Sequence, residues 1–169
     1  FGNVGSHAAR FLAEHGVKVV GITDAYGGVF CRGGLDVPAL EAHVSRTGTV
    51  RDFPSSEPLS NEQLFALDVD VLIPAATGHV ITAQNAPLVQ ARTVVEGANM
   101  PTTVEGMDLL TRRGVEVIPD IVANAGGVIA SMEEYSRSLS ATKTPQDQMF
   151  ATIRELLGTA LDQALQRRE

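Results

Sequence analysis

The sequence predicts an α/β fold in which a mostly parallel sheet is covered by helices on both faces. Short apolar runs rich in β-branched residues alternate with longer segments whose apolar residues recur at helical spacing. Glycine, proline and helix-capping residues separate these segments. Strands that alternate with helices in this way are buried on both sides, which is typical of a doubly wound sheet.

The first expected elements are a helix, a strand and a hairpin. Residues 3–15 carry an apolar stripe that Gly16 stops, and residues 17–23 are nearly uncharged and β-branched, as in a buried strand. The glycine-rich residues 27–34 indicate a small hairpin or an irregular loop. A helix that opens a parallel α/β domain should follow a strand, so we expect the first strand of the sheet to be missing from this sequence.

Capping residues position the next two helices. Asp36 is a candidate cap with Pro38 in the first turn, which predicts a helix to about residue 47. Ser60 and Gln63 match the capping-box spacing and predict a short helix over residues 61–66. The remaining expected elements are strands over residues 69–74, 93–97 and 115–118, and helices over residues 104–113, 125–139 and from 145 onward.

The composition is that of one packed globular domain. The chain has 169 residues, of which 44% are hydrophobic and 20% charged. Its net charge of −7 argues against nucleic acid or an anionic membrane as the main partner. A single cysteine, Cys31, excludes an internal disulfide and favours a reducing compartment, so we expect a cytoplasmic protein. Neither Cys31 nor the four histidines show metal-ligand spacing, and we expect no metal.

The first residues carry part of a dinucleotide-binding fingerprint. Gly2 and Gly5 match its second and third glycines, and Asp24 follows Gly2 by 22 residues, where an acid accepts hydrogen bonds from an adenosine ribose. The backbone amides of Asn3 and Val4 lie at the positive end of the first helix and would face a pyrophosphate. These features favour a Rossmann-type sheet. The alternative is an ordinary tight turn before a helix, with Asp24 as a loop cap.

Three later segments share a chemical theme. Each follows an apolar strand-like run and offers small residues with an amide or hydroxyl, as at Ala75 and Ala76, at Asn99 and at Asn124. In a parallel sheet these positions line the ligand crevice, and an Asn side chain carries both the donor and the acceptor that a nicotinamide carboxamide requires. The alternative for each Asn is a turn or a helix cap.

Taken together, these motifs closely resemble the glutamate/leucine/phenylalanine/valine dehydrogenase family. The resemblance covers residues 1 to about 140 and agrees in order and spacing. The matching motifs are Phe-Gly-Asn-Val-Gly at 1–5, Val-Leu-Ile-Pro-Ala-Ala at 71–76, Val-Val-Glu-Gly-Ala-Asn at 94–99, Pro-Thr-Thr at 101–103, and Ile-Pro-Asp-Ile-Val-Ala-Asn-Ala-Gly-Gly-Val at 118–128.

The resemblance implies an NAD- or NADP-dependent oxidative deamination of an amino acid to a 2-oxo acid and ammonium. It implies that residues of this chain hold the pyrophosphate (Gly2, Asn3 and Val4), meet the adenosine ribose (Asp24), line the cofactor path (Ala75 and Ala76) and contact the nicotinamide side (Asn99 and Asn124). Because a carboxylate at Asp24 would repel a 2′-phosphate, NAD is slightly favoured over NADP.

The resemblance also bears on the substrate. Ser131 matches the position that holds the side-chain carboxylate in glutamate-specific members, and Val128 matches a residue that lines the same pocket. A hydroxyl can donate to a carboxylate, whereas an apolar side chain would leave that charge unpaired. We therefore expect L-glutamate, with a leucine- or phenylalanine-type enzyme as one alternative. A second alternative is that Ser131 only bonds to its own helix backbone.

The chain also departs from the family pattern. It opens without an initiator methionine, which suggests a fragment. Compared with the family pattern, we expect the first strand, the first glycine and the substrate domain with the family's catalytic lysines and aspartate to be absent, and the C-terminus to be short. The only lysines, Lys18 and Lys143, match neither catalytic position. We therefore expect residues 1–169 to be an incomplete dinucleotide-binding domain, inactive alone, from an enzyme that is hexameric in its family. The alternative from another class is a non-catalytic dinucleotide-binding module.

Overall fold

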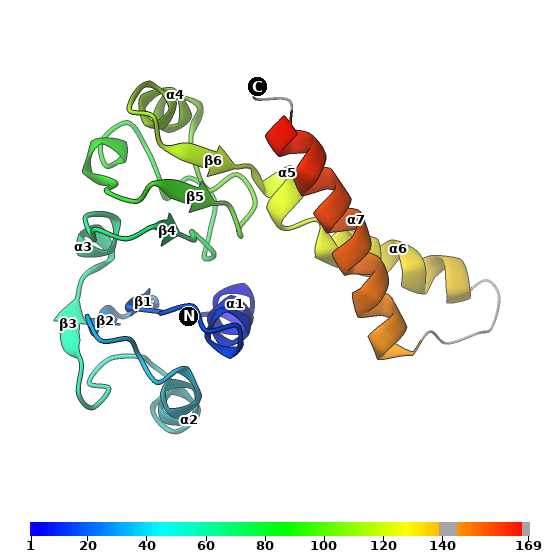
Figure 1. Ribbon diagram of the computed structural model, residues 1–169. Helices are drawn as coiled ribbons and strands as arrows, with labels where there is room; N and C mark the ends of the chain where they lie inside the picture. Colours follow the sequence, from blue (N-terminus) through cyan, green and yellow to red (C-terminus); the bar gives the residue numbers. More distant parts are fainter. Residues whose placement is uncertain (139–144, 167–169) are drawn as a thin grey trace. The chain divides into compact units, whose positions relative to one another are not determined.

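The computed structural model describes residues 1–138 and 145–166 (Figure 1). The chain divides into two compact units, residues 1–117 and 118–169, and each is described by itself. The first unit contains α1 (Asn3–Glu14), β1 (Gly21–Thr23), β2 (Gly28–Phe30), α2 (Val37–Thr47), β3 (Glu57–Leu59), α3 (Asn61–Phe65), β4 (Val71–Leu72), the 3-10 helix η1 (Ala86–Leu88), β5 (Thr93–Val95), α4 (Val104–Arg112) and, at its end, β6 (Glu116–Ile118). The second unit contains α5 (Asp120–Ala123), α6 (Gly126–Ser138) and α7 (Gln146–Gln166).

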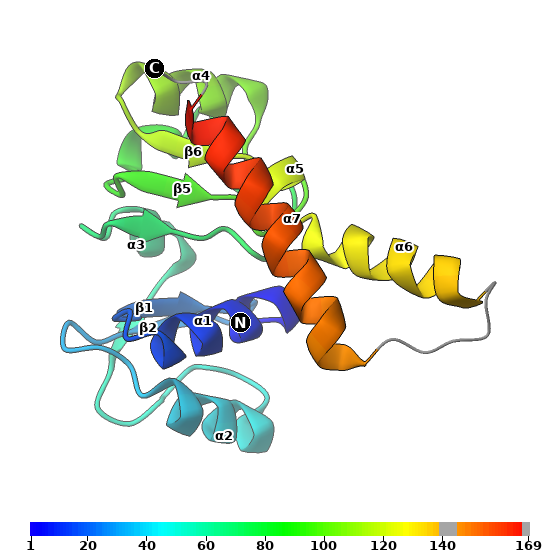
Figure 2. The ribbon, with the colours of Figure 1, turned by 45° about the vertical axis from the view of Figure 1, so that its right-hand side comes forward.

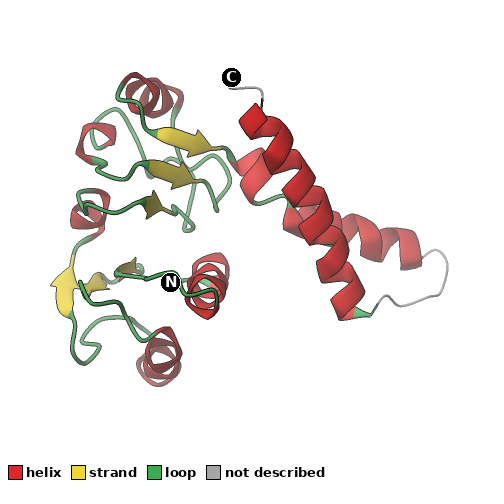
Figure 3. Ribbon diagram, viewed as in Figure 1, coloured by secondary structure: helices red, strands yellow, loops and turns green. Residues whose placement is uncertain are grey.

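The strands form two three-stranded sheets (Figure 3). One has the order β1-β2-β3, and both of its pairs are antiparallel. The other has the order β4-β5-β6, and in it Val71 and Leu72 pair in parallel with Thr93 and Val94. The α/β class with parallel pairing is confirmed. The glycine-rich residues 27–34 do not form a hairpin by themselves: residues 28–30 form β2, which pairs with β1 across a turn at residues 24–27, and the rest of the segment is a loop.

The two sheets each have an open edge. Among the described residues, β1 pairs with β2 alone and β4 pairs with β5 alone. The amino group of Phe1 donates to the carbonyl oxygen of Thr23, so the first residue lies beside the end of β1.

The helix caps follow the sequence prediction. The Asp36 carboxylate accepts a 3.0 Å hydrogen bond from Ala39 N at the start of α2, and Gly48 ends that helix with φ of 77°. Ser60 and Gln63 form both bonds of the capping box at α3, at 3.1 and 2.8 Å. These bonds join residues three positions apart, which is why the sequence alone predicts them.

Several boundaries differ from the expected ones. The strands expected over residues 17–23 and 69–74 are paired only at 21–23 and 71–72. Val19 and Val20 instead accept backbone hydrogen bonds from Leu35 and Cys31, in loops outside the ladder. The short helix α5 was not expected, and Pro119 is its N-cap. Asp120 is its first residue and accepts a bond from Ile121 N at 2.7 Å. Residue 139, the expected end of the following helix, lies outside the described residues.

Two apolar clusters form the core of the first unit. One surrounds the sheet β4-β5-β6, with Ile81, Val94 and Leu110 completely buried. The other surrounds β1 and β2, where Val29 of β2 and Leu40 of α2 are buried. The helices α1 and α2 lie side by side (Figures 1 and 2). The β1-β2-β3 sheet and the β4-β5-β6 sheet thus each have a core of their own.

The second unit is built from helices. A Cβ added at Gly126 would lie 3.3 Å from Ile153 Cγ2 and 3.7 Å from Leu157 Cδ1, so the start of α6 packs closely against α7. The short helix α5 also contacts α7. Within the described ranges, no helix combines the length and the hydrophobicity needed to cross a membrane.

Candidate functional site

The N-terminus of α1 is open to an anion. Gly2 caps the helix with extended backbone angles, no side chain bonds to the first amides, and the first turn contains no acidic residue. A Cβ added at Gly2 would meet nothing within 4 Å, so the backbone faces open space there. The first amides of a helix have no partner within the helix, and here they carry its partial positive charge. These features are compatible with an anion at the helix start, and the pyrophosphate contact expected of Gly2, Asn3 and Val4 stays a prediction.

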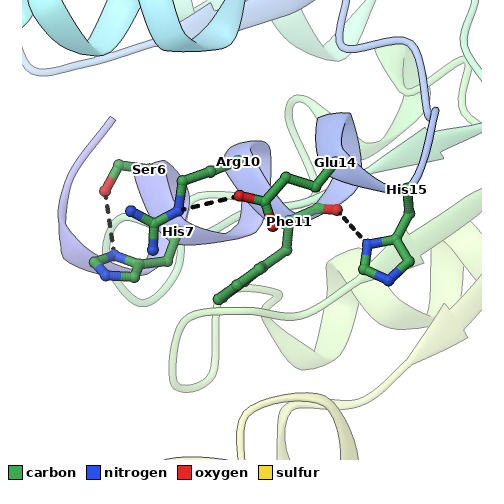
Figure 4. A network of polar contacts seen from close by, with 6 residues as sticks. All are labelled: Ser6, His7, Arg10, Phe11, Glu14 and His15. Atoms are coloured by element: carbon green, nitrogen blue, oxygen red, sulfur yellow. Dashed lines mark hydrogen bonds and ion pairs between the residues drawn. The ribbon is translucent and has the colours of Figure 1, made fainter.

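The solvent face of α1 plays no part in this opening (Figure 4). His7 Nδ1 donates to Asn3 O at 2.8 Å, and His15 Nδ1 donates to Phe11 O at 2.7 Å. Arg10 forms a 4.0 Å ion pair with Glu14 one turn along the same helix. These side chains bond within α1, so His7 and His15 are surface residues of the helix.

The start of α1 packs against the ends of β4 and β5. A Cβ added at Gly97 would lie 3.3 Å from Ala75 Cβ and 3.5 Å from Val4 Cγ1. A Cβ at Gly5 would lie 3.8 Å from the same Ala75 Cβ. The structure thus brings together three segments that the sequence singled out separately, and it does so through contacts that only small residues permit.

The loops after β4 and β5 are joined by backbone hydrogen bonds. Pro74 O accepts from Gly97 N at 3.1 Å and from Ala98 N at 2.9 Å, and His79 N donates to Met100 O at 2.9 Å. His79 and Met100 both adopt left-handed backbone angles, with φ of 57° and 45°. Such conformations persist where the surrounding structure imposes them. The exposed Asn99 thus lies on a fixed loop, where its backbone carbonyl oxygen would be 3.2 Å from a Cβ added at Gly78.

Asp24 lies directly after β1, as a ribose-binding acid should, but its carboxylate is fully engaged within the chain. Oδ1 accepts from Tyr26 N at 2.7 Å and Gly27 N at 3.1 Å, and Oδ2 accepts from the Thr49 hydroxyl and from Val50 N, both at 2.8 Å. Burial by itself raises the pKa of Asp24, but these four bonds outweigh it and hold the pKa below its ordinary value. These bonds match the alternative in which Asp24 caps a loop. A contact between Asp24 and the adenosine ribose stays a prediction.

Sequence reasoning did not find Thr49 as the partner of Asp24, because 25 residues separate the two and nothing in the sequence links them. It also gave no separate role to Glu96, which directly follows β5 and has only 3% of its surface exposed. A charged residue directly after an apolar, β-branched run was the available signal for Glu96. Among the described residues, no group of histidine, cysteine and acidic side chains is arranged to hold a metal ion.

The residues expected at the substrate lie in the second unit. Asn124 is the C-cap of α5, and its backbone N–H donates to Asp120 O at 2.8 Å. Val128 and Ser131 share one face of α6 and line an open, mostly apolar hollow of about 440 Å³ with Gly127, Met132 and Tyr135. In the described part of the chain the Ser131 hydroxyl has no hydrogen-bond partner, so it is available to a ligand. Lys143 lies outside the described residues.

Comparison with known proteins supplies the remaining evidence. The family model of glutamate/leucine/phenylalanine/valine dehydrogenases matches residues 1–169. The NADP-specific glutamate dehydrogenase of Saccharolobus shibatae is 46% identical over 140 residues, 83% of this chain and 33% of that protein. The NAD-specific glutamate dehydrogenase of Staphylococcus aureus is 42% identical over 162 residues, 96% of this chain and 39% of that protein.

Solved structures agree with the sequence matches. The hetero-hexameric glutamate dehydrogenase of Thermus thermophilus, in a leucine-bound form, superposes with a TM-score of 0.88 at 28% identity, covering 96% of this chain and 38% of that one. The chain therefore spans well under half the length of the proteins it matches.

Proposed function

Because the chain belongs to the glutamate/leucine/phenylalanine/valine dehydrogenase family, we propose that it is the cofactor-binding part of an enzyme that oxidatively deaminates L-glutamate to 2-oxoglutarate and ammonium with NAD or NADP. The observation that carries the proposal is the packing of the uncapped start of α1 against Ala75 and Gly97 at the ends of β4 and β5. In open α/β sheets, ligands bind at this edge.

The residues of the first unit have distinct roles in this proposal. The amides of Asn3 and Val4 bind the pyrophosphate, and Gly2 lets the backbone approach it. Ala75 and Ala76 line the cofactor path, and their small side chains leave space for a flat ring. The Asn99 side chain offers a donor and an acceptor to the carboxamide, and Asn124 in the second unit offers the same groups. When bound, the nicotinamide accepts the hydride that the amino acid gives up.

Ser131 and Val128 carry the substrate proposal. The free Ser131 hydroxyl donates to the side-chain carboxylate of glutamate, and Val128 packs against its methylene groups. A leucine- or phenylalanine-type enzyme would place an apolar side chain where Ser131 stands. The acid and base that move protons in the reaction are not among the residues of this chain, so residues 1–169 alone turn over no substrate.

The finer properties of the enzyme are also proposals. The negative charge of Asp24 gives NAD a slight preference, while relatives named NADP-specific and NAD-specific are both similar to this chain. A homohexamer is proposed from the family, of which the Thermus thermophilus relative is a hetero-hexameric member. The low cysteine content supports a cytoplasmic location.

A substrate panel on the protein at its natural length tests the proposal. NADH and NADPH formation is followed with L-glutamate, L-leucine and L-phenylalanine, and the 169-residue chain serves as the inactive control. Turnover is expected with glutamate and only at natural length. Preference for leucine or phenylalanine would support the alternative substrates. Cofactor binding without any turnover would support a non-catalytic module. Turnover by the 169-residue chain would contradict the proposal that this chain only binds the cofactor.

A further inference from the structure

Met132 is an exposed methionine that lines the hollow on α6. Its side chain is 69% exposed, and it lines this hollow of about 440 Å³ together with Val128, Ser131 and Tyr135. These residues recur every three or four positions, so they share one face of the helix. A Cβ added at Gly127 would meet nothing within 4 Å, which shows that this face is open at the start of the hollow.

The opposite face of α6 is the one that packs within the second unit. A Cβ added at Gly126 would lie 3.3 Å from Ile153 Cγ2 of α7, and Ile129 and Ala130 are half-buried. At 3.6 residues per turn, these positions lie on the side of the helix away from Met132. Packing against α7 therefore does not cover Met132, and its thioether sulfur is accessible to small solutes.

The four methionines of the chain differ in exposure. Met100 is 65% exposed, whereas Met107 packs against the core around β4-β5-β6 and Met149 is half-buried in α7. A thioether is oxidised only where an oxidant reaches the sulfur. Met100 and Met132 should therefore react first, and of these two Met132 lies in the hollow that Ser131 also lines.

We propose that Met132 is an oxidation site through which hydrogen peroxide weakens substrate binding by the enzyme, an inference that rests on the proposed function. The sulfur lone pair attacks one peroxide oxygen, and the O–O bond breaks as the S–O bond forms. The transferred oxygen gives its proton to the departing hydroxide, which leaves as water. The sulfur is thereby oxidised by two electrons and the peroxide is reduced. The product is methionine sulfoxide, which dedicated reductases convert back to methionine.

Oxidation changes the chemistry of the hollow. The thioether is apolar, whereas the sulfoxide oxygen is polar and accepts hydrogen bonds. In the proposed function the Ser131 hydroxyl donates to the side-chain carboxylate of glutamate in this hollow. The new oxygen repels that carboxylate and offers the hydroxyl a competing acceptor. KM for glutamate should rise about 10-fold. The value of kcat should change little, because the groups that move protons in the reaction are not among the residues of this chain.

The test compares the protein at its natural length before and after treatment with hydrogen peroxide. Wild type, Met132→Leu and Met100→Leu are treated, and dithiothreitol then reduces reversibly oxidised thiols such as Cys31. Met100→Leu is the matched control, because it removes the other strongly exposed methionine of the chain. The values of kcat and KM for L-glutamate are compared with those of the same variant untreated. Peptide mass spectrometry locates the added oxygen, and methionine sulfoxide reductases are applied to a final sample.

In the wild type, peroxide should add oxygen to Met132 and raise KM, and the reductases should restore KM. Met100→Leu should respond as the wild type does, whereas peroxide should leave the KM of Met132→Leu unchanged. Three results would overturn the oxidation site alone: Met132 is not oxidised, KM stays constant although Met132 is oxidised, or KM rises equally in Met132→Leu. Absence of glutamate turnover in the untreated wild type would instead contradict the proposed function, and the oxidation site with it.

Discussion

The hydroxyl of Thr49 donates a 2.8 Å hydrogen bond to Asp24 Oδ2 across 25 residues of sequence. Val50 N donates to the same oxygen, so the loop after α2 is tied to the end of β1 by a single carboxylate. The tie holds the turn after β1 against the loop after α2. An acid that looks from the sequence like a cofactor ligand thus has a structural task as well.

Removal of the Thr49 hydroxyl should destabilise the fold. Thr49→Val keeps the shape of the side chain but leaves a lone pair of Asp24 without its donor, and we expect a loss of about 1–3 kcal/mol in the free energy of unfolding. Thr49→Ser keeps the donor and should lose clearly less. Urea unfolding of both variants measures this. Equal losses of stability in the two variants would contradict a stabilising role for the hydrogen bond.

The Asp24 tie should weaken in acid. Because the pKa of Asp24 in the fold lies below its ordinary value of 3.8, the carboxylate adds stability at every pH above that value. This contribution is lost as the pH falls through the pKa of the folded state. The stability difference between the wild type and Asp24→Asn should therefore be largest at about pH 6 and shrink towards about pH 3. A difference that stays constant over this range would contradict the assignment.

Arg113 should be far more important for stability than its neighbour Arg112. The Arg113 guanidinium donates to Ala86 O at 2.6 Å and to Val89 O at 2.8 Å, and so fastens η1 to the end of α4. Arg113→Ala leaves these two carbonyl groups, which belong to the buried residues Ala86 and Val89, without that donor. We expect the free energy of unfolding to fall by about 2 kcal/mol.

Arg112 provides the matched control for this change. It pairs with Asp108 at 2.9 Å, but the two side chains are 73% and 54% exposed. Exposed pairs four residues apart on a helix contribute little, so Arg112→Ala should cost less than about 0.5 kcal/mol. Thermal unfolding of both variants tests the contrast, and similar shifts in Tm would refute it.

A methyl group at Gly97 should destabilise the fold. In Gly97→Ala it would lie 3.3 Å from Ala75 Cβ, closer than an ordinary contact, so this neighbour must shift by a few tenths of an ångström. Overpacking of this kind costs about 1–3 kcal/mol. In the protein at natural length, binding of both NADH and NADPH should weaken as well.

Gly158 offers the opposite case, because a Cβ there would meet nothing within 4 Å in the middle of α7. Gly158→Ala should therefore stabilise the chain by about 0.5–1 kcal/mol, since alanine loses less backbone entropy in a helix. Denaturant unfolding compares the two substitutions. Destabilisation by both would mean that α7 is packed more tightly than these distances indicate.

Ser131 should decide the amino acid that the enzyme prefers. Ser131→Ala removes the donor to the side-chain carboxylate, and kcat/KM for glutamate should fall about 10- to 100-fold in the protein at natural length. The same variant should lose little activity on leucine. Met132→Leu, which changes a neighbour in the same hollow without altering polarity, is the control. An equal fall with both amino acids would exclude a specific contact between Ser131 and the carboxylate.

The sequence by itself determined the local elements and the family. Asp36 with Ala39 and Ser60 with Gln63 act within one helical turn, so residue type and spacing were enough to predict them. The motifs at residues 1–5, 71–76 and 94–99 likewise identified the family from contiguous residues. Strand ends were predicted less well, because pairing depends on a neighbouring strand and not on the strand's own residues.

The tertiary structure alone decided how these segments meet. Thr49 reaches Asp24 across 25 residues, and Arg113 reaches Ala86 across 27. Gly97 touches both Ala75 and Val4, from the ends of two other segments. Such contacts depend on how long loops close around the core, and neither helical spacing nor local propensity carries that information. For this reason the sequence named Asp24 as a ligand, and only the fold showed which donors hold it.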